Sequence, residues 1–163
     1  MADPIDKAFI QLINQNLGIA HKVCKAYFRD QADREDAMQE MMYQLWKSFH
    51  RFDGLSKFST WMYRVCLNTA LTYRRKNRNM ESLTPLHDQV KDQNPENREE
   101  TIAILFDAIS TLSQMNKAIV LLYMDDMSYE DIASITGLSK SNVSVRLVRI
   151  KRELEIILTE KLK

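Results

Sequence analysis

The chain contains 163 residues, of which 45% are hydrophobic, and its formal net charge is +1. This length suits one domain of ordinary size or two small ones. No apolar run approaches the roughly 18 residues of a membrane span, and the first residues lack the basic-then-apolar plan of a signal peptide. We therefore expect a cytoplasmic protein without membrane insertion.

The first predicted helix extends to about Tyr27, although Gly18 could break it. Apolar residues recur at three- and four-residue steps here and along most of the chain, which has only three glycines and three prolines. This periodicity predicts an all-α fold. Cys24 lies in this helix and Cys66 lies in a later one, without a close Cys pair or a zinc-like Cys/His pattern. Both are predicted to be reduced core residues.

A second helix is predicted to begin near Asp33. One wide apolar stripe of this helix contains Ala37, Met38, Met41, Met42, Leu45, Trp46 and Phe49. The opposite face carries Asp36, Gln39, Glu40, Tyr43 and Lys47. The pattern alone favours an ordinary solvated surface for this polar face.

A third helix follows a turn at Asp53-Gly54, and Ser59 or Thr60 is a plausible N-cap. Residues 60–79 contain five basic residues and no acid. A helical projection places Met62, Val65, Cys66, Thr69 and Tyr73 on an inner side, and a second line contains Trp61, Arg64, Asn68, Thr72 and Arg75. This line could stack on unpaired bases and neutralise phosphates. The pattern equally allows a core tryptophan beside solvated arginines.

Residues 77–98 lack a sustained apolar face and contain Pro85 and Pro95. Because this stretch is too long for a structureless loop inside one compact domain, it is predicted to be a flexible linker. The chain is thereby divided into two small helical domains, residues 1–76 and residues 99–163.

The second domain is predicted to contain helices over residues 99–110 and 114–125, followed by a helix-turn-helix. Ser128 can cap its first helix, Gly137 supplies the turn, and Ser139 can cap the last helix. The inner residues of its first helix are Ile132, Ala133 and Ile135. An ordinary helical hairpin is the alternative, and the basic character of residues 139–152 favours DNA binding.

The last helix has an inner stripe of Val143, Leu147, Ile150 and Leu154. Its opposite side presents Ser141, Ser144, Val145, Val148, Arg149 and Arg152. The first turns of such a helix can reach base edges in the major groove, while its flanking basic residues hold phosphates. Arg149 is the best candidate for a base contact, and Arg146 at the border of the core stripe is assigned to phosphate.

At these residues the chain resembles the bacterial RNA polymerase sigma factors of the two-domain extracytoplasmic function (ECF) type. Residues 33–40, continuing to Leu45-Trp46, resemble region 2.2 of the family. Residues 51–70 resemble regions 2.3 and 2.4, and residues 112 to about 154 resemble region 4.

The resemblance implies three binding surfaces, and it implies neither a cofactor, a metal nor a catalytic residue. Docking on the clamp helices of the largest subunit of core RNA polymerase falls on Asp36, Gln39, Glu40, Met42 and Trp46. Recognition and melting of the promoter −10 element falls on Trp61, Arg64, Asn68, Thr72, Arg74 and Arg75. Recognition of the −35 element falls on Ser141, Asn142, Ser144, Val145, Arg146, Val148 and Arg149. Region 4 also touches the polymerase flap, and an anti-sigma factor is a further expected partner.

Two departures from the family limit what can be transferred. Family members often have a basic residue at the position of Ser144 and a large or basic one at that of Val148, and residues 52–57 are variable among them. The base preference therefore cannot be inferred.

Two other functional classes compete with this interpretation. A free-standing helix-turn-helix regulator would bind operators without polymerase, but it would not need the Asp36-Gln39-Glu40 face or the Trp61 line. An enzyme has little support, because no nucleophile, base or metal spacing surrounds His21, His50 or His87.

Overall fold

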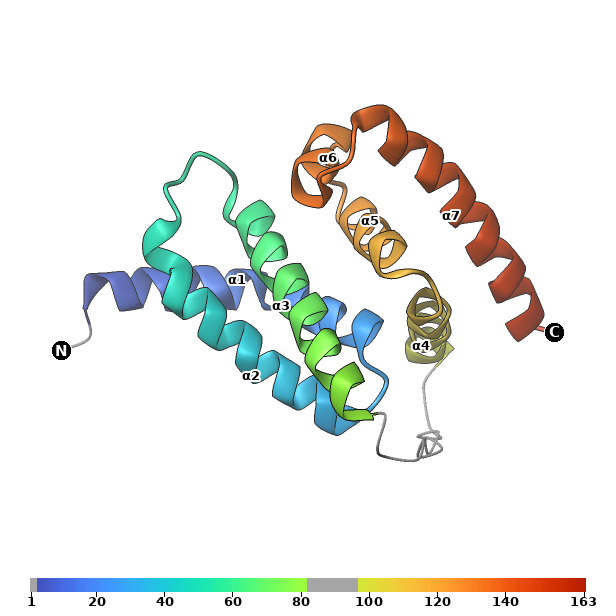
Figure 1. Ribbon diagram of the computed structural model, residues 1–163, viewed down its shortest axis with the longest axis horizontal. Helices are drawn as coiled ribbons and strands as arrows, with labels where there is room; N and C mark the ends of the chain where they lie inside the picture. Colours follow the sequence, from blue (N-terminus) through green and yellow to red (C-terminus); the bar gives the residue numbers. More distant parts are fainter. Residues whose placement is uncertain (1–2, 82–96) are drawn as a thin grey trace.

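The computed structural model describes residues 3–81 and 97–163, and this part of the chain is helical without any strand. The prediction of an all-α fold is confirmed. Two groups of helices lie side by side (Figure 1). The N-terminal bundle consists of α1 (Pro4–Tyr27), α2 (Gln31–Ser48), the short 3₁₀ helix η1 (Phe49–Arg51) and α3 (Phe58–Glu81). The C-terminal bundle consists of α4 (Asn97–Ser110), α5 (Gln114–Met124), α6 (Tyr129–Thr136) and α7 (Lys140–Lys161).

Helix α1 begins where the sequence places strong start signals. The Asp3 carboxylate accepts a hydrogen bond from the Ile5 N–H at 3.1 Å, and Pro4 occupies the first helical position, where its missing N–H costs nothing. The helix continues without interruption through Gly18, so the break that Gly18 could have caused does not occur. Because α1 buries Ile13 before Gly18 and Ile19 and Ala20 directly after it, one glycine is not enough to end the helix.

The turn before α3 has the predicted chemistry, but the predicted cap is wrong. Gly54 has φ +76°, and the Asp53 carboxylate accepts a hydrogen bond from the Leu55 N–H at 2.9 Å. Helix α3 already begins at Phe58, so Ser59 and Thr60 lie in its first turn and do not precede it.

The inner side of α3 largely matches the projection. Met62, Cys66 and Thr69 are buried, whereas Val65 and Tyr73 are half-buried. Tyr63 is also fully buried, which the projection did not single out.

The predicted linker, residues 77–98, overlaps the ends of two helices. Helix α3 continues to Glu81 and α4 begins at Asn97. The remaining residues of the predicted linker, 82–96, lie outside the described residues. The division of the chain into domains at this point stays a prediction.

The helix-turn-helix of the C-terminal bundle is built from the capping residues named above. Ser128 Oγ accepts from the Asp131 N–H at 3.1 Å, and Ser139 Oγ accepts from the Asn142 N–H at 3.1 Å. Gly137 has φ +77°, the left-handed conformation that ends α6 without a Cβ penalty. The last helix packs its buried stripe on α4, α5 and α6, and all four predicted residues are buried: Val143, Leu147, Ile150 and Leu154.

The two bundles also pack against each other. Helix α1 contacts α4 and α5, and α3 contacts α5 and α6. The hydroxyl of Tyr27 at the end of α1 donates a hydrogen bond to the Gln114 carbonyl oxygen at 2.7 Å. Within the described residues, no helix combines the length and the apolar character needed to cross a membrane.

Candidate nucleic-acid interface

One surface of α3 carries most of the polar line that the projection predicted. Arg64, Asn68, Thr72 and Arg75 are all exposed. Thr72 Oγ1 donates to the backbone carbonyl oxygen of Asn68 at 2.9 Å, which holds the Thr72 side chain against the preceding turn of the helix. The line combines amide and guanidinium groups without an acid, so it favours a ligand with phosphates and hydrogen-bonding edges.

Trp61 lies at one end of this line in a half-buried position. Its ring centroid is 5.4 Å from that of Phe58, 5.5 Å from that of Phe52 and 6.2 Å from that of Phe49. One side of the indole therefore packs on the core and the residue keeps an exposed part, and the role of this exposed part in nucleic-acid binding stays a prediction. Contact with these rings fixes the orientation of the indole. A tryptophan without such contacts on a protein surface would not have a fixed orientation.

The aromatic cluster around Trp61 was missed by the sequence reasoning. Its other members are Phe49, Phe52 and Phe58, and Phe9 of α1 extends it with a centroid 5.2 Å from that of Phe49. Four aromatic residues within residues 49–61 were the available signal, although their spacing crosses a 3₁₀ helix and a turn and follows no single period.

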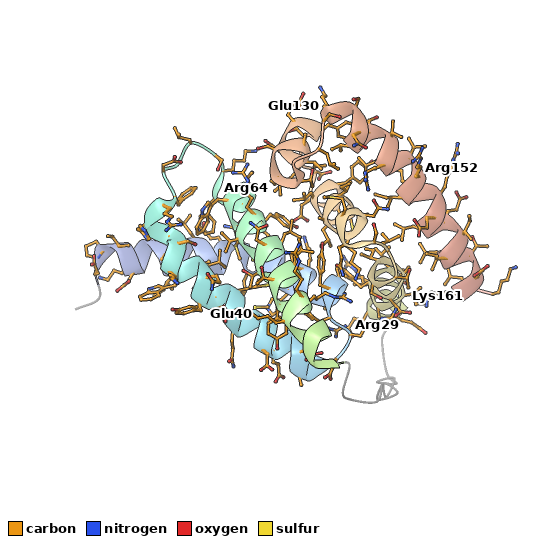
Figure 2. The ribbon with its side chains drawn as sticks, viewed as in Figure 1. Arg29, Glu40, Arg64, Glu130, Arg152 and Lys161 are labelled. Carbon is orange, nitrogen blue, oxygen red and sulfur yellow. The ribbon has the colours of Figure 1, made fainter. Side chains whose placement is uncertain are left out.

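The two arginines at the ends of the line differ in their contacts. The Arg64 guanidinium donates to Ser134 Oγ of α6 at 2.6 Å, and Figure 2 shows it at the end of α3 nearest α6. Arg74 is half-buried and donates to the carbonyl oxygen of Tyr27 at 2.8 Å. Arg74 therefore also serves the end of α1, a structural contact that the prediction did not include.

The outer face of α7 presents the residues predicted for duplex reading. Ser141, Asn142, Val145, Val148 and Arg149 are exposed, and Ser144 is half-exposed. Val145 and Val148 leave 51% and 52% of their surface accessible. Exposed apolar groups beside arginine match a surface that contacts thymine methyl groups and base edges.

Basic residues beside this face are held by neighbouring helices. Arg146 is half-buried and donates to Asn116 Oδ1 at 3.2 Å. Lys151 donates to the Tyr123 hydroxyl at 3.0 Å, and this hydrogen bond raises the pKa of Lys151. Lys140 at the start of α7 pairs with Glu130 at 2.5 Å, which lowers the pKa of that carboxyl group. Arg149 and Arg152 are exposed, and Figure 2 shows Arg152 on the outer side of α7.

The polar face of α2 forms a third surface. Asp36 and Gln39 are exposed, whereas Glu40 is half-exposed and accepts a hydrogen bond from Gln44 Nε2 at 2.9 Å. Met42 is half-buried at the margin of the core. Trp46 was assigned to the apolar stripe, yet it is 58% exposed because α1, α3 and η1 leave that side of α2 uncovered.

The buried titratable groups belong to the core. Cys24 and Cys66 are free and buried, and Cys24 Sγ lies 3.7 Å from Met41 Sδ. Burial raises the pKa of Cys24 to about 11 and also raises the pKa of Cys66, so neither thiol is activated as a nucleophile. Among the described residues, no three His, Cys, Asp or Glu side chains gather as metal ligands would.

Comparison with known proteins shows the family to which the chain belongs. The family model for sigma-70 region 2 matches residues 12–80, and that for sigma-70 region 4 matches residues 102–154. The ECF RNA polymerase sigma-E factor of Haemophilus influenzae is 32% identical over 138 residues, covering 76% of this chain and 73% of the relative. That of Escherichia coli strain K12 is 30% identical over 152 residues, covering 83% of this chain and 80% of the relative. The chain belongs to the ECF sigma factor family.

Solved structures of similar fold include two further proteins. The sigma factor RpoE from Bartonella quintana, solved with the anti-sigma factor NepR, is 19% identical and has a TM-score of 0.75 over 94% of this chain and 98% of its own. CnrH, solved with the cytosolic domain of CnrY, is 19% identical and has a TM-score of 0.69 over 95% of this chain and 90% of its own.

Family membership decides between the two non-enzymatic functions. This sigma factor is an alternative sigma factor that binds core RNA polymerase and directs promoter-specific transcription initiation. The free-standing regulator is not favoured, because the N-terminal bundle matches a polymerase-associated region and not an effector module. The family comprises DNA-binding initiation factors and not known enzymes.

Proposed function

We propose that the two bundles divide promoter recognition, with α3 capturing the −10 element and α7 reading the −35 element. The observation that carries this proposal is the exposed line on α3, where Arg64, Asn68, Thr72 and Arg75 continue from the oriented indole of Trp61. Arg74, beside this line, contributes positive charge. The chain itself then acts without catalytic chemistry.

Strand capture on α3 follows from the chemistry of these side chains. Extruding a base from the duplex costs a few kcal/mol, least at easily opened steps, and contacts with the extruded base must offset that cost. Stacking on an aromatic ring contributes about 1–3 kcal/mol per base. Trp61 supplies the ring, Asn68 supplies an amide for base edges, and the arginines bind the backbone.

Duplex reading on α7 assigns different roles to its charged and apolar residues. Arg149 contacts a base, while Ser141, Asn142 and Ser144 approach the backbone or base edges from the first turns. Val145 and Val148 supply apolar contacts. Arg146 is assigned to phosphate, and its hydrogen bond to Asn116 holds it against α5 for that purpose.

Docking on polymerase is assigned to the polar face of α2. Asp36, Gln39 and Glu40 bind the clamp helices of the largest subunit, with Met42 and Trp46 at the margin, and the C-terminal bundle touches the flap. Each DNA contact is weak alone. When both bundles are bound to one polymerase, the second contact becomes effectively intramolecular and gains from a high local concentration.

An inhibitory partner is a further part of the proposal. The structural relative RpoE was solved with an anti-sigma factor, and the likeness of fold supports a partner of the same kind for this chain. Such a partner would cover the α2 face or the DNA-binding surfaces.

In vitro transcription tests the proposed function. The purified chain is expected to bind duplex promoter DNA poorly, and addition of core RNA polymerase is expected to produce specific binding and initiation at defined start sites. Start-site mapping on genomic DNA fragments measures this result and identifies the two elements. Tight and specific DNA binding by the chain alone, unchanged by polymerase, would contradict the proposal.

A further inference from the structure

The core of the N-terminal bundle brings together sulfur-bearing side chains from three different helices. We refer to Cys24 of α1, Met41 of α2 and Cys66 of α3 as the sulfur cluster. Cys24 is 3% exposed, whereas Met41 and Cys66 are fully buried, and both cysteines are free thiols. The proposed DNA and polymerase surfaces use none of these three residues, so the proposed function leaves their chemistry unassigned.

The contact between Cys24 and Met41 has the geometry of two ligands of one metal ion. The Cys24 thiol donates to Met41 Sδ, and the two sulfur atoms are 3.7 Å apart. Two sulfurs bound to one cation at about 2.3 Å lie about 3.8 Å apart in a tetrahedral arrangement and about 4.0 Å apart in a trigonal one. A cation that replaces the thiol proton can therefore bind both sulfurs with little movement of either helix.

Cys66 makes a third sulfur available from α3. Helix α1 packs on both α2 and α3, and the two thiols lie in one core. Burial, and then the charge of Cys24, raise the pKa of Cys66, so the two thiols are near enough to interact. Each long helix of the bundle thus contributes one ligand.

The ligands and the charge of the sulfur cluster decide which cation fits. Thiolate and thioether sulfurs are soft ligands that favour soft metal ions such as Cu(I). A monovalent cation that replaces the Cys24 proton leaves the net charge of the core unchanged, and the proton goes to solvent. Structural Zn(II) takes four ligands. Within the described ranges, no third Cys, His, Asp or Glu gathers with the two thiols, so Zn(II) would lack a ligand.

The raised pKa of the thiols does not prevent such binding. Burial raises the pKa of Cys24 to about 11, and the positive charge of Arg34 acts in the opposite direction. Arg34 is held beside the end of α1, because its Nε donates to the Phe28 carbonyl oxygen at 2.7 Å. A bound cation deprotonates a coordinating thiol outright, since its charge stabilises the thiolate. Without the cation, the thiols stay protonated as an ordinary part of the core.

We propose that the sulfur cluster is a binding site for one monovalent soft cation, Cu(I), coordinated by the sulfurs of Cys24, Met41 and Cys66. The cation connects α1, α2 and α3 at one point and stabilises the N-terminal bundle. Because the cluster is buried, the cation enters when the helices separate transiently. This site involves neither DNA nor polymerase and is independent of the proposed function.

The experiment titrates the full chain with Cu(I) buffered by a chromophoric chelator, with the thiols reduced and oxygen excluded. Competition with the chelator measures stoichiometry and affinity, and X-ray absorption measures the number of sulfur neighbours of the bound ion. One Cu(I) with three sulfur neighbours is expected. The melting temperature, followed by circular dichroism, should rise with Cu(I), because a ligand that binds only the folded chain stabilises it. Zn(II) should raise it less.

Three variants test the ligands one at a time. Met41→Leu keeps a similar volume and should leave the fold intact, as circular dichroism would confirm. It should weaken Cu(I) binding at least about tenfold, a loss that even outer-shell changes cause at metal sites. Cys24→Ala should abolish binding, and Cys66→Ala should reduce the number of sulfur neighbours to two.

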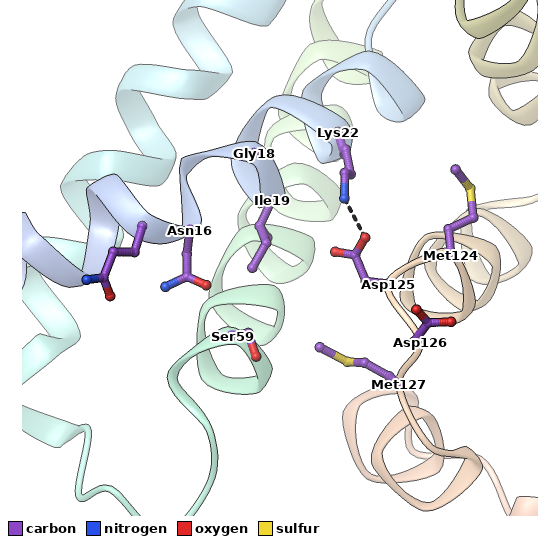
Figure 3. A pocket seen from close by; sticks show the side chains of 10 residues that line it. Asn16, Gly18, Ile19, Lys22, Ser59, Met124, Asp125, Asp126 and Met127 are labelled. Atoms are coloured by element: carbon purple, nitrogen blue, oxygen red, sulfur yellow. Dashed lines mark hydrogen bonds and ion pairs between the residues drawn. The ribbon is translucent and has the colours of Figure 1, made fainter.

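Met124→Leu is the matched control, because Met124 is 38% exposed on α5 and lies outside the sulfur cluster. Figure 3 shows Met124 beside a pocket in which Asp125 pairs with Lys22. Asp125 also accepts a hydrogen bond from the Tyr63 hydroxyl. The described residues that line this pocket include Met127 but no cysteine, so a thioether here has no thiol partner. Met124→Leu should bind Cu(I) as the wild type does.

Three results would overturn the inference. The first is equal Cu(I) affinity of the wild type and Met41→Leu. The second is a melting temperature that falls when Cu(I) is added, since this would show that the ion binds the thiols of the unfolded chain. The third is a larger rise in melting temperature with Zn(II) than with Cu(I).

Discussion

Trp61 shows how a single residue serves both the fold and the proposed DNA surface. Its indole packs against Phe49, Phe52 and Phe58, and the exposed remainder continues the polar line of α3. A residue fixed in this way can present a stacking surface without losing side-chain freedom when DNA binds. The aromatic cluster therefore orients the indole before the single DNA strand binds.

We predict that Trp61→Ala lowers promoter opening by about 5- to 150-fold, since one stacked base contributes about 1–3 kcal/mol. Permanganate reactivity of unpaired thymines in the polymerase complex measures this effect. Trp61→Phe, which keeps a ring, should lose less. As a stability control, Phe9→Leu alters the far end of the same cluster and should leave promoter opening near wild type. Equal opening by Trp61→Ala and wild type would remove Trp61 from the −10 surface.

At the scale of elements, the start of α7 depends on one hydroxyl group. Ser139 Oγ accepts from the Asn142 N–H at 3.1 Å and lies 3.3 Å from Ser141 Oγ. This cap orders the turns that carry Ser141 and Asn142 toward the proposed −35 element. The Ser139 cap thus affects both the stability of α7 and the positions of the residues proposed to contact DNA.

Ser139→Ala is expected to lower the free energy of unfolding by about 1 kcal/mol, the usual cost of losing an N-cap side chain. Urea unfolding followed by circular dichroism measures the change. Ser139→Thr retains an oxygen acceptor and should remain close to wild type. If Ser139→Ala and Ser139→Thr were equally stable, the cap would contribute nothing.

Two arginines on the outer side of α7 are expected to differ in what they recognise. Arg149→Ala should relax the preference for one base of the −35 element, losing about 1–3 kcal/mol of discrimination. Arg152→Ala should weaken binding nearly uniformly across sequences and reduce the salt dependence by about one phosphate contact. Selection from a library of randomised −35 elements, using the polymerase complex, distinguishes the two. The same sequence profile for both variants would contradict the assignment of Arg149 to a base.

The whole molecule combines surfaces of opposite charge. The net charge of +1 is the sum of opposite local charges. A face of α2 carries Asp36 and Glu40, and α3 and α7 each carry a basic surface. A near-neutral total is therefore compatible with DNA binding, because the local field decides which partner approaches each surface.

Glu40→Lys is expected to prevent association with core polymerase while leaving helix content and unfolding free energy near wild type. The physical reason is that a reversed charge at a polar docking contact repels the complementary charge of the polymerase and disfavours the correct alignment of the two surfaces. Glu160→Lys, at an exposed position near the end of α7 in the other bundle, is the matched charge reversal and should bind normally. Co-purification with core polymerase measures association, and full binding by Glu40→Lys would remove this face from the docking surface.

Much of the fold could be predicted because its causes are local. Ser128, Gly137 and Ser139 end and start helices through contacts within a few residues, and the α7 stripe follows directly from the helical period. The predictions that failed concern the ends and the continuity of helices, where a local signal competes with the packing of neighbouring residues. Ser59 and Thr60 are good caps, but α3 begins earlier at Phe58. The break that Gly18 could have caused is prevented by the buried residues on either side of it.

The amino-acid sequence by itself determined the helices, the helix-turn-helix and the polar lines on α2, α3 and α7, since one period assigns each side chain a direction. Only the tertiary structure decided what lies in that direction. Tyr63 and Asp125 are 62 positions apart, Arg64 and Ser134 are 70 apart, and Lys22 and Asp125 are 103 apart. A helical period contains no information about such partners, because they depend on how the completed helices pack.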